Sequence, residues 1–155
     1  MDSAGTADQA STRPLLRGRR LLTGLVAIAI AVSIVHYADN YLAYDSYPQL
    51  DSALNPSAGE ILAAWFVLTP FAIVGLVLLY RERVSAAAAC LAIYSISGLI
   101  GLGHYMVPGV GELPWWRHAH IFADIACGVA IVVSAVWLRR RFRPPGRTSA
   151  KNGVA

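Results

Sequence analysis

Long apolar stretches dominate this sequence of 155 residues and leave it few folds to adopt. They run over residues 21–38, 61–80, 85–106 and 119–138, and none of them contains lysine or arginine. Each is close to the ~20 residues that a helix needs to cross the hydrocarbon core of a bilayer. Hydrophobic residues make up 56% of the chain and charged residues only 14%, which is typical of a membrane protein. The sequence therefore predicts an all-α polytopic membrane protein, a bundle of four transmembrane helices.

Basic residues are distributed unevenly around these stretches. Of the 13 lysines and arginines, 12 precede the first stretch, lie between the second and third, or follow the fourth, and only Arg117 lies on the other side. The positive-inside rule then predicts a multi-pass protein of the cell membrane with both termini in the cytoplasm. The basic residues flank the spans and form no stripe with interleaved aromatic residues, so we expect no nucleic-acid partner.

The domain organisation follows from the short connections between the stretches. They leave room for one transmembrane domain, residues 17–143, and for no separate soluble domain. The segments 1–16 and 144–155 are rich in small and polar residues with little to bury, so we expect disordered cytoplasmic tails. The first stretch is about as long as a full span and has no convincing cleavage site after it, so we expect it to remain as a helix.

Ionisable side chains gather at the predicted outer ends of the stretches. They are His36 and Asp39 in the first, Glu60 before the second, His104 in the third, and His118, His120 and Asp124 around the start of the fourth. A rise of ~1.5 Å per residue places His36 and Asp124 about 21–22 Å above the inner boundary, and the other ionisable groups nearer the outer boundary. Such groups are costly in the membrane unless they pair, face a wet cavity or bind something.

Spacing indicates which of these side chains share a helix face. His36 and Asp39 are three residues apart, and His120 and Asp124 are four apart, so each helix presents an imidazole beside a carboxylate. His118 points roughly opposite to His120, and we expect it to turn away from a shared site. Any one of these residues alone would be interpreted as a polar helix end that bonds water or a carbonyl. Their convergence at one side favours a functional site.

The leading hypothesis is a site for a divalent transition metal, with zinc as the expected ion. The predicted ligands are His36, Asp39, His104, His120 and Asp124. Mixed imidazole and carboxylate ligands suit zinc, and an open coordination position would activate water for hydrolysis of a lipid ester or amide. Whether the protein is an enzyme stays open at this point. No Cys-x-x-Cys is present, which argues against a cysteine-based metal carrier.

Other functions remain open from the sequence. One is an electron-transfer subunit that binds haem b or a quinone, with histidines of two helices as axial ligands. Another is a pH-responsive or structural subunit of a membrane complex, since imidazole titrates near neutrality. The expected partners are the lipid bilayer, a lipid or quinone substrate, and a second copy or another membrane subunit.

The sequence contains a short internal repeat. His-Tyr occurs at residues 36–37 and 104–105, each time before a loop with proline and another helix. This repeat predicts two helical hairpins related by a pseudo-twofold axis along the membrane normal.

We interpret the tyrosines and tryptophans of the outer loops chiefly as an interfacial aromatic belt, with a lid over the polar site as the alternative.

Overall fold

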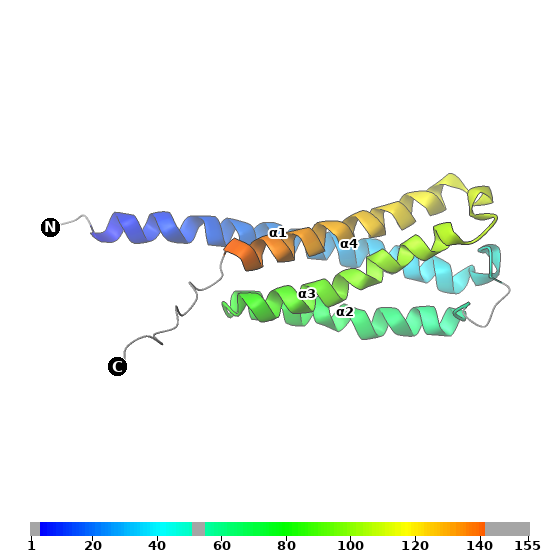
Figure 1. Cartoon of the computed structure of the whole chain (residues 1–155), viewed down its shortest axis with the longest axis horizontal. Helices are drawn as coiled ribbons and strands as arrows, with labels where there is room; N and C mark the ends of the chain where they lie inside the picture. Colours follow the sequence, from blue (N-terminus) through cyan, green and yellow to red (C-terminus); the bar gives the residue numbers. More distant parts are fainter. Residues whose placement is uncertain (1–3, 51–54, 142–155) are drawn as a thin grey trace, which may run out of the picture.

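The computed structural model describes residues 4–50 and 55–141, and this part of the chain is helical, with no β-strand. The elements are α1 (Ala4–Leu42), η1 (Tyr44–Ser46), α2 (Ala58–Tyr80), α3 (Val84–Leu99), η2 (Ile100–Met106), η3 (Val110–Glu112) and α4 (Trp115–Arg141), where η denotes a 3₁₀ helix. The four α-helices run side by side along an elongated bundle (Figure 1). We call the end that carries the 43–57 and 107–114 connections the loop end, and the opposite end the terminal end.

Each α-helix contributes one stretch that is long and apolar enough to cross a membrane. These stretches are Gly18–Leu42, Ala58–Tyr80, Val84–Met106 and Trp115–Arg141, the third including η2. They confirm the predicted all-α bundle with four candidate spans. Each begins or ends a few residues beyond the predicted limits, because polar residues such as Asn40 and His118 continue the helices.

The first helix starts earlier than we expected. Residues 4–16 belong to the segment that we expected to be a disordered tail, yet they continue α1 in the structure. The apolar span already supplies the helix nucleus, and adding further turns to an existing helix is much easier than starting one. The remainder of the two predicted tails, residues 1–3 and 142–155, lies outside the described residues.

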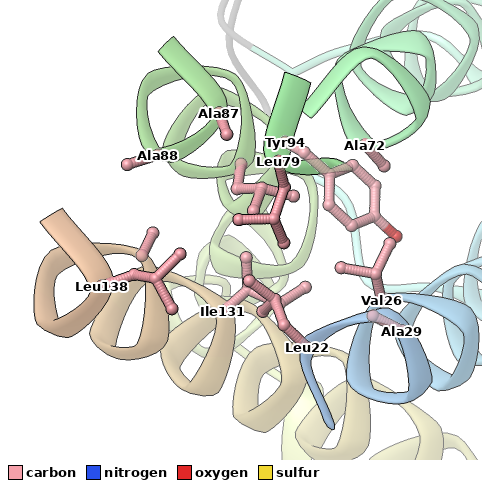
Figure 2. Packing of buried hydrophobic residues seen from close by; sticks show 12 residues of the cluster. Leu22, Val26, Ala29, Ala72, Leu79, Ala87, Ala88, Tyr94, Ile131 and Leu138 are labelled. Carbon is pink, nitrogen blue, oxygen red and sulfur yellow. The ribbon is translucent and has the colours of Figure 1, made fainter. Parts of the chain in front are cut away.

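A compact apolar core fills the terminal half of the bundle. α1 and α3 each pack against both α2 and α4, so the four helices form a closed ring of neighbours. Val26, Leu91 and Ile131 are completely buried among them. In Figure 2, labelled side chains from all four helices, with Tyr94 among them, point toward one another. Because the helices are packed together in the terminal half, their positions at the loop end are also fixed relative to one another.

Glycines bring α3 and α4 into close contact between this core and the loop end. A Cβ atom added to Gly98 would overlap the carbonyl oxygen of Asp124, and one added to Gly128 would lie 2.9 Å from the carbonyl oxygen of Ser95. Small residues commonly allow helix backbones to approach in this way within membranes. We call this close contact of α3 and α4 at Gly98 and Gly128 the glycine seam. It fixes the backbone of Asp124 directly against α3.

The third span changes its winding near the loop end. After Leu99, α3 gives way to the 3₁₀ helix η2, which contains Gly101, Gly103 and His104. Glycine is a poor α-helix former, and the 3₁₀ winding has about 3.0 residues per turn in place of 3.6. His104 therefore faces a different direction from the one that a continuous α-helix would give it.

Candidate functional site

The most buried polar contact of the loop end joins α1 to α4. His36 Nδ1 lies 2.7 Å from Asp124 Oδ2, and the two side chains are 4% and 3% exposed. An ionised carboxylate can only accept hydrogen bonds, so in a neutral His36 ring Nδ1–H donates and Nε2 carries a free lone pair. A carboxylate on one ring nitrogen commonly orients a histidine whose other nitrogen binds a metal. Asp124 thus directs His36 Nε2 toward its next neighbour.

That neighbour is His104, which η2 brings to the same place. The Nε2 atoms of His36 and His104 are 3.3 Å apart. Two nitrogens bound to one tetrahedral ion by bonds of about 2.0–2.1 Å are about 3.3–3.4 Å apart. The separation also fits a hydrogen bond in which the protonated nitrogen of one ring donates to the other. The pair can therefore hold either a proton or a metal ion.

His120 is the third imidazole of this region. Its ring centre lies 5.4 Å from that of His36, and its side chain is 10% exposed. Both of its ring nitrogens are buried and have no hydrogen-bond partner among the described residues. Buried polar atoms are rarely left in this state, so each such atom needs an explanation. Even so, across residues 4–50 and 55–141 no three His, Cys, Asp or Glu side chains are already arranged to hold a metal ion.

Asp39 belongs to a second group of contacts, which fastens the first loop. Its Oδ2 accepts a hydrogen bond from the hydroxyl of Tyr47 and lies 3.1 Å from Arg117 Nε and 3.4 Å from His120 Nε2. Arg117 also donates to the carbonyl oxygen of Ser46 over 3.3 Å, and its guanidinium group lies 4.7 Å from the centre of the Tyr47 ring. Burial and the hydrogen bond to Asp39 raise the pKa of Tyr47 well above its usual range. The charge of Asp39 is thus balanced by Arg117.

The remaining ionisable residues named from the sequence lie apart from the His36–His104 pair. His118 Nδ1 lies 3.1 Å from the hydroxyl of Tyr105, and the ring also stacks near Phe122. Glu60 caps the start of α2, where its carboxylate accepts a hydrogen bond from the backbone N–H of Ser57 over 2.8 Å. Both residues have the structural roles that polar groups near helix ends commonly take.

A cavity of about 440 Å³ adjoins the two paired histidines. It lies between α1, α2, η2 and the loop that follows η1. His36 and Asn40 line its α1 side, His104 its η2 side and Ala64 its α2 side, and most of the remaining wall is apolar. This volume falls within the ~300–1,000 Å³ of small-molecule pockets. The paired imidazoles thus face a space that a ligand can occupy.

Three residues position this site in ways that sequence reasoning missed. Tyr37 donates to the carbonyl oxygen of Ser97 over 2.9 Å and so fixes α1 against α3 beside His36. Tyr47 and Arg117 fasten the residues of η1 and just after it to Asp39. The sequence pattern favoured an interfacial belt for the loop tyrosines, with a lid over the polar site as the alternative. Arg117 gave the clearest signal in the sequence. It is the one basic residue at the predicted outer side, where the carboxylates lie, so an acidic partner could be expected.

Comparisons with models of protein families, with curated proteins and with solved structures found no match. The function of the chain is therefore inferred from its own residues, above all from the two imidazole nitrogens that face each other beside the cavity.

Proposed function

We propose that the protein is a multi-pass protein of the cell membrane that binds a divalent transition metal, zinc by its donor set, through His36, His104 and His120. One observation carries this proposal: the Nε2 atoms of His36 and His104 are 3.3 Å apart while Asp124 holds the other nitrogen of His36. The proposed third ligand is His120, whose ring centre lies 5.4 Å from that of His36. In the described part of the chain its Nδ1 has no hydrogen-bond partner and its Nε2 has only the 3.4 Å contact with Asp39 Oδ2, so the ring is available as a ligand.

The charge of Asp124 supports a cation at this place. Asp124 is 2% exposed, and its ion-pair partner in the described part of the chain is His36, which is charged only when protonated. A carboxylate without a compensating charge is costly in a membrane span. A divalent ion on His36 Nε2 supplies the positive charge that Arg117 supplies to Asp39.

The proposed ligand set differs from the sequence hypothesis in its carboxylates. Asp124 orients His36 through Nδ1, and Asp39 is engaged by Tyr47 and Arg117, so neither is proposed as a direct ligand. Zinc held by the three imidazoles would supply an activated water as a nucleophile near neutral pH.

Hydrolysis of an ester or amide is the reaction that such a site would support. In such a reaction the oxygen of water would bond to the carbonyl carbon, the bond from that carbon to the leaving oxygen or nitrogen would break, and the proton released by the water would pass to the leaving group. The cavity beside His36 and His104 provides room for the carbonyl group.

The orientation of the bundle is part of the proposal. The 12-to-1 distribution of basic residues supports cytoplasmic termini, which puts the loop end and its histidines at the outer face of the membrane. Reporter fusions after Arg83 and Arg143 should both report a cytoplasmic location. An external location at either point would overturn this orientation.

A haem fits the His36–His104 pair less well than a tetrahedral ion does. To hold a haem together, His36 and His104 would have to admit the porphyrin ring between their Nε2 atoms, which would need a separation of about 4 Å. The two Nε2 atoms are 3.3 Å apart. The tetrahedral separation of about 3.3–3.4 Å matches this distance more closely.

Elemental analysis of protein purified without chelator tests the proposal. We expect about one zinc per chain, as the single His36–His104 pair implies, and its loss in His104→Ala and His120→Ala, because removing one of three ligands removes most of the affinity. His118→Ala is the matched control and should retain zinc, since His118 bonds Tyr105 instead. Stoichiometric iron with a Soret band would favour the haem alternative. Absence of any metal would favour the pH-responsive or structural subunit.

A further inference from the structure

We infer that the cavity beside His36 and His104 receives one acyl chain from the outer leaflet and places the carbonyl end of that chain at the two imidazoles. The orientation toward the outer leaflet and the metal chemistry rest on the proposed function. The presence of an acyl-chain site rests on the shape and polarity of the cavity alone. Three features carry the inference: the lateral opening, the distribution of polar groups and the volume.

The first feature is an opening toward the surrounding lipid. η2 is held mainly by α3 and α4, whereas α2 packs on α3 and α1, and the two walls separate toward the loop end (Figure 1). Ile100 and Met106 line the cavity from η2 and are 52% and 80% exposed. Ile61 and Ala64 line it from α2 and are partly exposed. The cavity thus meets the lipid-facing surface between α2 and η2.

The second feature is the separation of polar from apolar lining. His36, Asn40 and His104 line the inner side, and Gln49, Asn55 and Glu60 line the side toward the loop end. Ile61 and Ala64 of α2, with Ile100 and Met106 of η2, present hydrocarbon between these two helices. Binding sites that are mostly apolar with a few convergent polar groups select ligands of the same character. An apolar chain with one polar carbonyl end matches this arrangement, and a wholly polar solute does not.

The third feature is the size of the space. A volume of about 440 Å³ holds about 15 non-hydrogen atoms at the ~30 Å³ that a water molecule takes up in the liquid. That is enough for a carbonyl end and the first part of one chain, with the rest of the chain extending through the opening into the bilayer. Only one chain enters this space, so a diacyl glycerophospholipid would leave its second chain and its headgroup crowded at the opening. The chemical class is therefore a single-chain fatty acyl ester or amide.

Photo-crosslinking in nanodiscs of phosphatidylcholine tests the inference. One probe is a monoacylglycerol with a diazirine in its chain, and the comparison probe is a diacyl phosphatidylcholine with the same modified chain. We expect the monoacyl probe to label the cavity residues Ile61, Ala64, Ile100 and Met106 several-fold more strongly than the diacyl probe. Ala64→Phe should reduce that labelling several-fold because the new ring occupies the cavity. Ala63→Phe is the matched control, since Ala63 is exposed and does not line the cavity.

A second filling variant guards against a folding defect. Gly103 lines the cavity and a Cβ atom there meets nothing within 4 Å, so Gly103→Leu should fold and should also reduce labelling. Uniform labelling of all lipid-facing helices, or labelling that neither filling variant reduces, would overturn the inference.

Zinc content measured on the same samples separates this inference from the proposed function. Zinc without cavity labelling would refute the acyl-chain site alone. Cavity labelling without zinc would support the acyl-chain site and refute the proposed metal.

Discussion

The two halves of the bundle use the same four helices in opposite ways. In the terminal half, side chains such as Val26, Leu91 and Ile131 are completely buried against one another. In the loop half, the helices are joined by buried polar contacts, including His36–Asp124, and a cavity of about 440 Å³ remains between them. Lipid is as apolar as leucine, so the terminal half gains its stability from close packing and not from exclusion of water. The comparison indicates that one half holds the helices in place while the other carries the polar groups and the cavity of the proposed site.

The largest expected effect on stability comes from a substitution in the packed terminal half. Leu91→Ala should lower the free energy of unfolding by about 2–5 kcal/mol, because it leaves a cavity in a close-packed region. The site should still bind zinc below the lowered unfolding temperature, because Leu91 lies outside it. Thermal unfolding and metal content of the same preparation measure both effects. Leu21→Ala is the control, since Leu21 is 66% exposed and should change little.

Equal losses of stability in the two leucine variants would contradict the assignment of the terminal half as the packed core.

The next largest effect comes from a substitution between the two halves, which should change both stability and zinc affinity. Gly98→Ala forces α3 away from the carbonyl oxygen of Asp124, and overpacking of this kind costs about 1–3 kcal/mol. Because the displaced backbone carries Asp124, zinc affinity should fall together with stability. Gly24→Ala provides the control, since a Cβ atom at Gly24 meets nothing within 4 Å. Normal zinc affinity in a destabilised Gly98→Ala protein would show that the seam does not position the site.

A smaller effect is confined to the loop half. Asp124→Asn removes the charge that orients His36 and should weaken zinc binding by about 10–100-fold. The amide keeps the size of the side chain, so the fold should persist. Competition with a chelator of known affinity measures the change. The control is Asp45→Asn in the exposed part of the first loop, and equal affinities in the two variants would argue against the orienting role.

The smallest effect concerns the loop contact with Asp39. The pKa of Tyr47 is raised in the folded protein, so the folded state keeps the phenol proton at a pH where the unfolded chain, with a pKa of about 10, loses it. The stabilisation is therefore complete below pH 10 and decreases as the pH rises above that value. Tyr47→Phe should lower stability by about 1 kcal/mol at pH 8 through the lost hydrogen bond. The difference in Tm between wild type and variant should shrink from pH 8 to pH 11, and a constant difference would contradict the coupling.

The fold was largely predictable from the sequence because the signal for a membrane span is local. Each stretch of about 20 apolar residues identifies its helix without reference to the others. Depth along each helix is also a local count, and it correctly grouped His36 with Asp124. The pairing of particular atoms was not predictable in this way.

Roles within the site depend on how the helices turn toward one another. Asp39 and Asp124 were both predicted as metal ligands, yet one faces Arg117 and the other His36. The direction of His104 depends on the 3₁₀ winding of η2, which replaces an expected α-helical turn. Rotation and local winding follow from tertiary contacts such as the glycine seam, so the sequence alone indicated the residues but not their partners.

The pairing of the first helix with the last has a consequence for the time course of synthesis. His36 precedes Asp124 by 88 residues, and α2 and α3 are made between them. At about 5–20 residues per second, His36 waits about 4–18 s on the growing chain before its carboxylate partner exists. The α2–α3 hairpin can pack during that interval, whereas the histidine stays without its partner until the last helix emerges. The site is thus completed only after α4 has been synthesised. A chain truncated before α4 would carry an incomplete site.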